Sequence, residues 1–187
     1  MNLDVSVFVF PRTVVISNRY IGSYSNCSIA WDKIMSFAKK NQLFEKNIIK
    51  SHPNSTTVIG LGYDDPKKTK KCRYDACLAI QDNVKIVSCG VISKIFQTIV
   101  SKIFTCKNEN KPTIMLEKGI TKKTIAEHKS LQYTHKGSYD DFEKIYPALF
   151  ELNYNFNYNF PCIEVYLNDP AKVQPSELLT EIYIPIY

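Results

Sequence analysis

The chain contains the same series of features twice, in the same order. The first series runs from Gly22-Ser23-Tyr24 through an apolar helical stripe to Asp64-Asp65-Pro66, and the second runs from Gly137-Ser138-Tyr139 through a similar stripe to Asn168-Asp169-Pro170. Because several features recur in one order, the sequence predicts two copies of one structural unit. Two like units usually build one domain, and the groove between them is the natural place for a ligand.

Each copy predicts a strand, a helix and two more strands. In the first copy we expect strands at 13–20, 56–63 and 72–80, and a helix at 28–40 that Ser28 can cap. In the second copy we expect strands at 124–135, 162–167 and 179–186, and a helix at 140–152. A further strand is expected at 84–88. The predicted fold class is α+β: two pseudo-symmetric strand-helix-strand-strand units form one antiparallel sheet, with helices on one face and a ligand cleft between the units.

The remaining residues fit between these two units. With 187 residues, of which 44% are hydrophobic, the chain is long enough for one substantial core, so we expect a single domain over 1–187. Its halves cover about 1–90 and 113–187, and an insertion at 91–112 separates them. Within the insertion, 91–104 has the pattern of an amphipathic helix. We expect this helix to cover the sheet, and contact with a membrane surface or a partner is the alternative.

The segment 153–160 has an unusual composition. It alternates Asn with Tyr154, Phe156, Tyr158 and Phe160. In an extended segment this alternation would place the four rings on one side. We expect ordinary packing of a loop here, and an aromatic lid is the alternative.

The formal net charge of +6 belongs to the first half of the chain. Residues 1–90 carry 13 basic and 7 acidic side chains, and residues 91–187 carry 11 of each. Four of the basic residues form the run Lys67-Lys68-Thr69-Lys70-Lys71, which we expect to be a solvated loop, with contact to an acidic partner as the alternative. Because no recognition-helix pattern is present, we expect no direct binding of nucleic acid.

The cysteines and the apolar runs exclude several classes of protein. The six cysteines, at positions 27, 72, 77, 89, 106 and 162, show no CxxC pairing and no companion histidines, so we expect free thiols, no metal site and no cofactor. No run reaches the roughly 18 apolar residues that a spanning helix needs. The first residues, Met1-Asn2-Leu3-Asp4, carry an acidic residue where a secretory signal is basic, which predicts a cytoplasmic protein.

The two copies differ most informatively at Glu164. Aligning Pro170 with Pro66 places Glu164 against Gly60, so a carboxylate in one copy faces a position without a side chain in the other. In a strand, Glu164 shares a face with Tyr166, and the aliphatic residues on the other face are expected to meet the helices. A carboxylate in a partly enclosed groove needs a cation, hydrogen-bond donors or a proton.

A positively charged aromatic ligand would meet this need, because aromatic faces attract cations by about 0.5 to 2 kcal/mol each. The rings that we expect to line such a site with Glu164 are Tyr166, Tyr183, Tyr24, Tyr74, Tyr139 and Trp31. The alternative is structural: Glu164 lies at an exposed edge or pairs with a neighbour such as Arg73.

Five segments together resemble a known family. They are Asp64-Asp65-Pro66, Cys72-Arg73-Tyr74-Asp75, the segment 135–139, the segment 161–170 and the segment 178–185. They look like the gyrase-inhibitor-like (GyrI-like) effector-binding domain, which also forms the ligand-sensing domain of many AraC-type and MerR-type multidrug regulators. The resemblance covers nearly the whole chain, and the C-terminal third is its most specific part.

The resemblance implies two strand-helix-strand-strand units around a cleft for amphipathic, often cationic, organic molecules. It also implies that a glutamate in the C-terminal half holds the positive charge of the ligand, and the matching residue here is Glu164. Only about a dozen residues precede the first expected strand, which leaves no room for a helix-turn-helix, so we expect a stand-alone sensor. The insertion at 91–112 and the segment 153–160 depart from the family pattern, and the identity of the ligand does not transfer.

Three functions are compatible with these features. The first is a receptor or sequestering protein for a cationic amphipathic small molecule. The second is a protein-protein modulator acting on DNA gyrase or a separate regulator, through the basic run at 67–71 or the helix at 91–104. The third is a hydrolase of strained-ring toxic compounds in which Glu164 acts as acid or base. No nucleophile-base pair is evident, and we expect His135 to be structural, so binding without catalysis is favoured.

Overall fold

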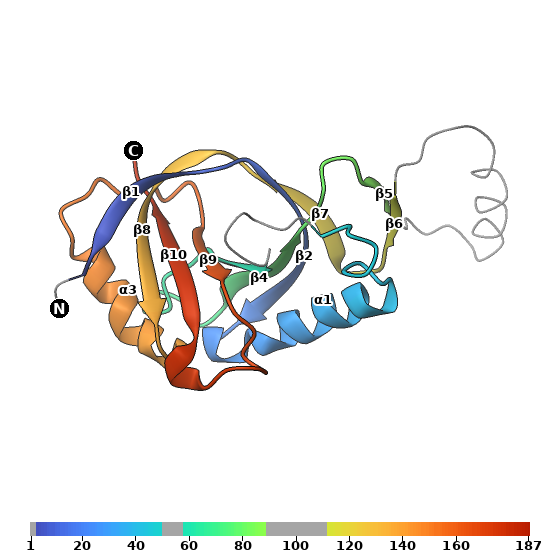
Figure 1. Cartoon of the computed structure of the whole chain (residues 1–187). Coiled ribbons are helices and arrows are strands. Elements are labelled where there is room, and N and C mark those ends of the chain that lie inside the picture. The colour runs from blue at the N-terminus through green and yellow to red at the C-terminus, as the bar shows by residue number, and fades with distance from the viewer. Residues whose placement is uncertain (1–2, 50–57, 89–111) are drawn as a thin grey trace, which may run out of the picture.

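A computed structural model describes residues 3–49, 58–88 and 112–187 (Figure 1). Eight strands form one sheet in the order β1-β8-β10-β9-β3-β4-β2-β7, and β5 and β6 form a separate parallel pair. The strands are β1 (Val5–Phe10), β2 (Thr13–Gly22), β3 (Val58–Gly62), β4 (Cys72–Ala79), β5 (Lys85–Ser88), β6 (Thr113–Leu116), β7 (Ile120–Ile125), β8 (His128–Lys136), β9 (Cys162–Tyr166) and β10 (Leu179–Pro185).

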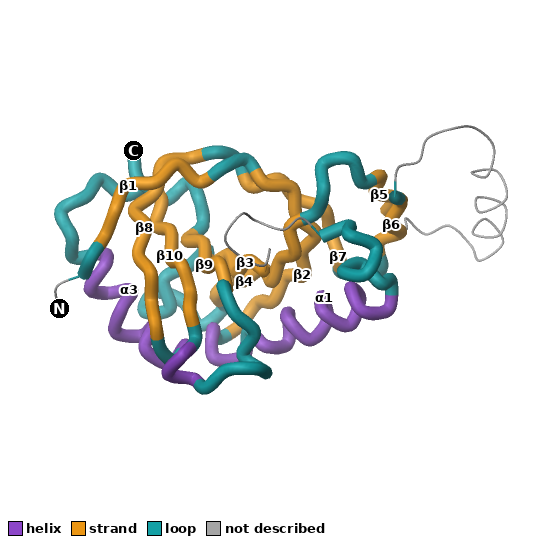
Figure 2. Tube along the Cα trace, viewed as in Figure 1, coloured by secondary structure: helices purple, strands orange, loops and turns teal. Residues whose placement is uncertain are grey.

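Two helices lie on one face of this sheet, α3 (Phe142–Phe150) at the lower left and α1 (Ser28–Lys40) at the lower right of Figure 2. Each follows a short 3-10 turn, η1 (Tyr24–Asn26) before α1 and η2 (Tyr139–Asp141) before α3. A third turn, η3 (Pro175–Glu177), precedes β10. All pairings in the eight-stranded sheet are antiparallel. The predicted α+β class, with one antiparallel sheet and helices on one face, is confirmed.

The middle of the sheet contains strands of both halves of the chain, with each half on its own side of the centre. β9 and β3 lie at its centre, β10 and β4 lie outside them, and β8 and β2 lie outside those. In the first half Tyr74 of β4 pairs with Gly62 of β3, and at the matching place in the second half Thr180 of β10 pairs with Tyr166 of β9. The pseudo-twofold axis itself stays a prediction.

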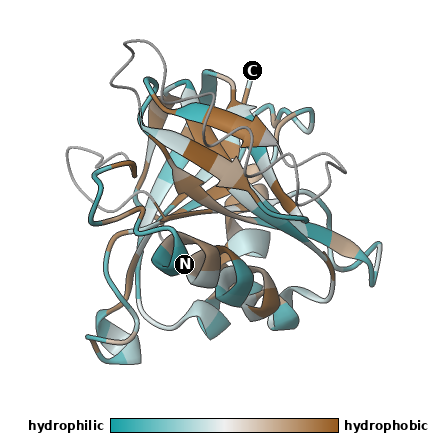
Figure 3. Cartoon of the chain, turned by 90° about the vertical axis from the view of Figure 1, so that its right-hand side faces the viewer, coloured by the Kyte–Doolittle hydropathy of each residue, from teal (hydrophilic) through white to brown (hydrophobic). Residues whose placement is uncertain are grey.

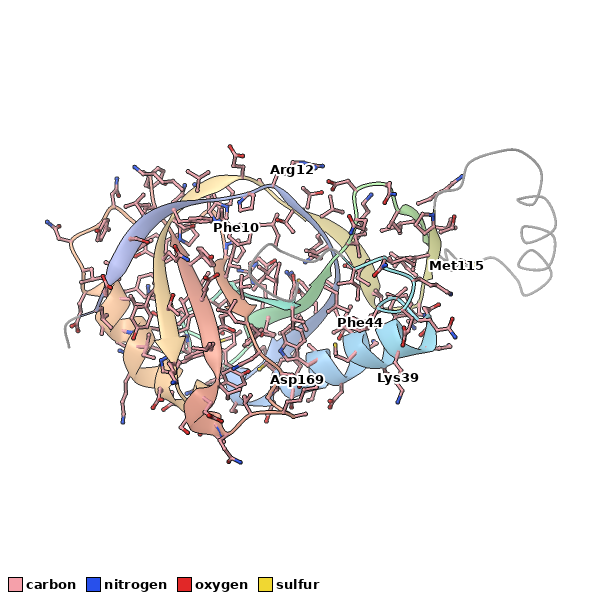
Figure 4. The ribbon with its side chains drawn as sticks, viewed as in Figure 1. Phe10, Arg12, Lys39, Phe44, Met115 and Asp169 are labelled. Carbon is pink, nitrogen blue, oxygen red and sulfur yellow. The ribbon has the colours of Figure 1, made fainter. Side chains whose placement is uncertain are left out.

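A long two-stranded ribbon joins the two ends of the sheet. β1 pairs with β8 and β2 pairs with β7, and only Pro11 and Arg12 separate β1 from β2. The register continues across this break, since Phe10 pairs with His128 and Thr13 pairs with Ile125. The ribbon therefore arches over the face of the sheet that lies opposite the helices (Figures 1 and 4), with Phe10 labelled beneath it and Arg12 at its crest.

Apolar side chains consequently cover both faces of the sheet, and Figure 3 shows many of the hydrophobic residues, coloured brown, in its strands. On the helix face, α1 buries Ala30, Ile34, Phe37 and Ala38, and α3 buries Ile145 and Leu149. On the arch face, a separate cluster contains Phe10, Val15, Ile59, Ile163, Val165 and Tyr183. The alternation of each strand therefore places one set of residues against the helices and the other set under the ribbon.

Several expected elements require correction. The segment 124–135 is not one strand, because β7 ends at Ile125 and β8 begins at His128. β1 and β6 were not expected at all. The helix at 28–40 has the predicted bounds, but its N-cap is Cys27 and not Ser28, and no side chain caps it. Its stability comes instead from the buried apolar stripe and from Lys39 and Lys40, which complement the helix dipole in the last turn.

The two unusual segments have different outcomes. The amphipathic pattern at 91–104 lies outside the described residues. The segment 153–160 is a loop without a regular strand: Phe156 forms a single bridge with Ile186, Phe160 stacks on His128, and Tyr158 is 80% exposed. Phe156 and Tyr158 pack against Phe150 of α3, so the rings of this segment pack as loop residues at two separate places. In the described part of the chain, no helix has the length and apolar character needed to cross a membrane.

Candidate ligand-binding site

Glu164 lies at the centre of the sheet, where the two halves meet. It belongs to β9 and pairs directly with Gly60 of β3, as the alignment of the two copies predicts. A methyl group added at Gly60 would lie 2.3 Å from the hydroxyl of Tyr74 and 2.9 Å from the Oε2 atom of Glu164. The missing side chain at Gly60 therefore makes the space that the carboxylate and this phenol occupy.

Three phenol hydroxyls surround the carboxylate of Glu164. Tyr166 donates to Oε2 at 2.5 Å, Tyr146 donates to Oε1 at 2.8 Å, and Tyr74 lies 3.5 Å from Oε2. The three tyrosines come from β9, α3 and β4. Glu164 is 8% exposed, and in the described part of the chain it forms no ion pair with Lys, Arg or His. An enclosed carboxylate is thus held by neutral donors alone.

The hydrogen-bond network continues to α1. The hydroxyls of Tyr74 and Tyr166 lie 2.9 Å apart, and the indole N–H of Trp31 donates to the hydroxyl of Tyr74 at 3.1 Å. Trp31 also packs edge-on against the rings of Tyr74 and Tyr166. Both helices therefore contribute an aromatic side chain to this network: Tyr146 of α3 bonds to the carboxylate itself, and Trp31 of α1 bonds to Tyr74.

Two tyrosines from the 3-10 turns complete the aromatic wall. Tyr139 packs edge-on against Tyr166 with ring centroids 5.4 Å apart, and Tyr24 packs edge-on against Tyr74 at 6.1 Å. The hydroxyl of Tyr24 also donates to the carbonyl of Asp64 at 2.8 Å, which ties the turn to the loop after β3. We call Trp31, Tyr74, Tyr139, Tyr146 and Tyr166 the aromatic cage. Tyr74 is buried, and the other four rings are half-buried.

Burial governs the ionisation of these groups. Removal from water raises the pKa of the Glu164 carboxyl above its ordinary value, and the hydrogen bonds from Tyr166, Tyr146 and Tyr74 oppose this shift without cancelling it. Burial, and then the charge of Glu164, raises the pKa of Tyr74, Tyr146 and Tyr166 well above the ordinary phenol value. The phenols therefore stay protonated donors, and the carboxylate would gain from a cation.

The structure groups most, but not all, of the residues that the sequence singled out. Glu164, Tyr166, Tyr74, Tyr139 and Trp31 lie together, and Tyr24 stands behind Tyr74. Arg73 does not pair with Glu164, because its guanidinium forms an ion pair with Asp64 at 2.8 Å.

Tyr183 does not belong to this group. It lies on the arch face, packs against Phe8 and Phe10, and donates to Glu181 at 2.6 Å. The expectation that Tyr183 shares a site with Glu164 is therefore wrong.

The orientation of Glu164 is also corrected. The aliphatic residues Ile163 and Val165 lie under the ribbon, and Glu164 faces the helices. Aliphatic residues need not meet the helices, because the ribbon also requires an apolar face. The candidate site consequently lies between the sheet and the ends of α1 and α3.

Tyr146 is the site residue that sequence reasoning missed. Its hydroxyl donates to Glu164, and it belongs to the apolar helical stripe of the second copy. The repeat contained the signal, because Tyr146 follows Tyr139 at the same spacing as Trp31 follows Tyr24. If one member of such a pair faces the cleft, its counterpart is expected to face it as well.

A groove elsewhere on the surface is separate from this cage. It has a volume of about 480 Å³ and lies along α1 beside the turn that precedes β7, lined by Ile29, Asp32, Lys33, Ser36, Phe37, Lys40 and Glu117. None of these residues contacts Glu164. The rings close over the carboxylate, so a ligand reaches it only after at least one of them moves.

Aromatic side chains with a few placed polar groups are the usual lining of a small-molecule site, and the aromatic cage around Glu164 has this composition. The comparison with protein families agrees. The model of the GyrI-like small molecule binding domain matches residues 3–187, and the chain therefore belongs to this family. The family resemblance found in the sequence is confirmed. A comparison with curated proteins found no match.

Solved structures share this fold at low sequence identity. The C-terminal domain of EcmrR superposes with a TM-score of 0.61 and 18% identity, covering 100% of this chain and 99% of that one. In the complex of EcmrR with DNA, the TM-score is 0.62 and the identity 19%, and the match covers 98% of this chain but 57% of that chain. The present chain thus spans little more than half the length of that protein.

Two other solved structures have the same fold, and one is named for a bound ligand and the other for an enzyme activity. SAV2435 bound to tetraphenylphosphonium has a TM-score of 0.56 and 10% identity, covering 99% of this chain and 94% of that one. A hydrolase from Listeria innocua has a TM-score of 0.55 and 11% identity, covering 98% of this chain and 91% of that one. At these identities the likeness extends to the fold alone.

Proposed function

We propose that this protein binds amphipathic organic cations, with the positive charge against Glu164 and the flat body of the ligand between the rings of the aromatic cage. The observation that carries the proposal is the enclosed carboxylate, whose hydrogen-bond partners among the described residues are Tyr166, Tyr146 and Tyr74. Such a group is costly to ionise without a nearby positive charge. A cationic ligand supplies that charge.

The surrounding rings suit such a ligand. Aromatic faces attract cations, with contributions of about 0.5 kcal/mol at exposed sites and about 2 kcal/mol when water is excluded. Trp31, Tyr139 and Tyr166 pack edge-on in a continuous row, so a flat cation can separate two of them and stack. Because four of the five rings are half-buried, entry requires rotation of side chains at the surface and no opening of the sheet.

The charge of the ligand provides a direct test. Tetraphenylphosphonium and tetraphenylborate have nearly the same size and shape but opposite charge. In isothermal titration calorimetry, the proposal predicts binding of the phosphonium and at least ten-fold weaker binding of the borate, since the anion would approach a carboxylate. Equal affinity for both ions would contradict the proposal and reduce the cage to a hydrophobic surface.

Two roles fit a binding domain of this kind: a sensor of the ligand, or a protein that sequesters it. SAV2435, which shares the fold, has been seen with an aromatic cation, and this supports the choice of ligand class. The cytoplasmic location and the single-domain organisation with an insertion at 91–112 stay predictions. So does action on a protein partner such as DNA gyrase.

Hydrolysis is the second candidate function. A carboxyl with a raised pKa, held between phenols, can serve as a general acid, and a fold relative is named a hydrolase. Among the described residues, Glu164 has no hydrogen bond with a Ser or His. Burial raises the pKa of the nearby thiols of Cys27 and Cys162, so these stay neutral and the hypothesis gives the role of nucleophile to water. His135 is engaged elsewhere, with the carbonyl of Ser138 at 3.1 Å.

A further inference from the structure

One buried hydroxyl beside the aromatic cage lacks a hydrogen-bond partner. The side chain of Thr180 is fully buried, and its Oγ1 atom has no partner among the described residues. The two other atoms of this kind, in His128 and Ser130, lie on the arch face next to Phe10 and Phe8. Of these three groups in the described residues, only the Thr180 hydroxyl lies on the helix face, which is also the face of Glu164.

The register of the sheet fixes the place of Thr180 relative to the cage. Thr180 pairs with Tyr166 on one side and with His135 on the other, and its neighbour Ile182 pairs with Glu164. Thr180 is therefore the diagonal neighbour of Glu164 on the same face, with Cα atoms roughly 7 Å apart. It occupies the place in the second half that Tyr74, a ring of the cage, occupies in the first.

Two rings cover this part of the sheet. Tyr139 packs edge-on against Tyr166, Phe142 packs edge-on against His135, and Tyr139 and Phe142 contact each other at 5.8 Å. The pair therefore spans the two neighbours of Thr180. Rotation of Tyr139, which is half-buried, would uncover the Thr180 hydroxyl beside the carboxylate.

We propose that Thr180 is a hydrogen-bonding subsite of the cage and selects cations that carry an oxygen at one ring's length from the charged centre. This inference rests on the proposed function, and it adds a class of ligand to it. An unpartnered buried hydroxyl is costly in the ligand-free protein. A ligand that hydrogen-bonds to it removes this cost, so binding gains more than it would from a hydroxyl exposed to water.

The test compares two matched probes. One is triphenylphosphonium with a 4-hydroxymethylphenyl group, and the other carries a 4-ethylphenyl group of nearly the same size. The measured quantity is the ratio of the affinities for the alcohol and the ethyl compound. This ratio is expected to be about five-fold larger for wild-type protein than for the Thr180→Val variant, which is the size of one net hydrogen bond. Thr180→Ser keeps the hydroxyl and is expected to keep the preference.

The Thr180→Val variant also has a readout that needs no ligand. Valine preserves the shape of threonine and removes the orphan hydroxyl, so the Tm of the ligand-free protein is expected to rise by about 3 °C. An unchanged preference between the probes in Thr180→Val, or a fall in Tm, would overturn the proposal.

The experiment separates failure of the Thr180 subsite from failure of cation binding. If wild-type protein binds both phosphonium probes but Thr180→Val leaves their ratio unchanged, the subsite is refuted and cation binding stands. If wild-type protein binds neither probe, cation binding fails and the subsite fails with it.

Discussion

The space above Gly60 allows the sharpest test of how the cage is built. A methyl group at this position would lie 2.3 Å from the Tyr74 hydroxyl and 2.9 Å from Oε2 of Glu164. Carbon and oxygen atoms in contact normally lie about 3.5 Å apart, so the phenol would have to move by about 1 Å. Tyr74 is 3% exposed and is held between Trp31 and Tyr24, which leaves little room for that movement.

Gly60→Ala is therefore expected to lower the free energy of unfolding by about 1 to 3 kcal/mol, the usual cost of overpacking a core. For a chain of this size, this corresponds to a fall in Tm of about 3 to 8 °C. Cation binding is expected to weaken as well, because the displaced Tyr74 and Glu164 belong to the cage. Urea unfolding gives the free energy, and titration with tetraphenylphosphonium gives the affinity.

Gly62→Ala is the matched control in the same strand. The nearest atom to a methyl group at Gly62 is the Tyr24 hydroxyl at 3.4 Å, which is ordinary contact. Alanine restricts the unfolded chain, so the free energy of unfolding of this variant is expected to stay within about 1 kcal/mol of the wild-type value. Equal stability of the Gly60→Ala and Gly62→Ala proteins would refute the packing argument.

Three further perturbations test other parts of the account. Because burial raises the pKa of Glu164, its neutral form persists to higher pH in the ligand-free protein, and a bound cation must displace the proton. The affinity for tetraphenylphosphonium is therefore expected to rise as the pH rises through the raised pKa. An affinity that does not change with pH would contradict this. Tyr146→Phe removes a donor to the carboxylate, so the pKa of Glu164 is expected to rise further, visible in its side-chain carbon chemical shift. Burial alone would raise the pKa of Asp75 on the arch face, but hydrogen bonds from Arg19, Lys123 and Tyr63 together lower it. Its contribution to stability is therefore present above about pH 4 and lost as the pH falls through the lowered pKa. Asp75→Asn is expected to lower the free energy of unfolding by about 2 kcal/mol. This is less than the usual cost of breaking a fully buried ion pair, because the side chain of Arg19 is 37% exposed. An unchanged urea unfolding curve would contradict this expectation.

Much of the fold was predictable because the repeat constrains it. The helix at 28–40 has the expected bounds, and the pairing of Glu164 with Gly60 followed from aligning the two prolines. Local patterns sufficed here, since apolar spacing defines a helix and a repeated turn fixes the register of the strand before it.

The arch was not predictable by the same means. β1 and β7 reveal themselves through their pairing with β8 and β2, and such long-range pairing leaves no mark in a single sequence. This one omission reversed the orientation of β9. With only helices available to bury a face, the aliphatic side of β9 was assigned to them, and Tyr183 was grouped with Glu164. The ribbon covers that aliphatic side instead.

The central claim is that Glu164 holds the positive charge of the ligand. The most direct measurement is the dissociation constant of tetraphenylphosphonium for the wild-type protein and for Glu164→Gln, taken by calorimetry at one pH above the raised pKa of the carboxyl. Glutamine keeps the size and an acceptor for the phenols but removes the charge. The account predicts at least ten-fold weaker binding to Glu164→Gln, and equal affinity of the two proteins would contradict it.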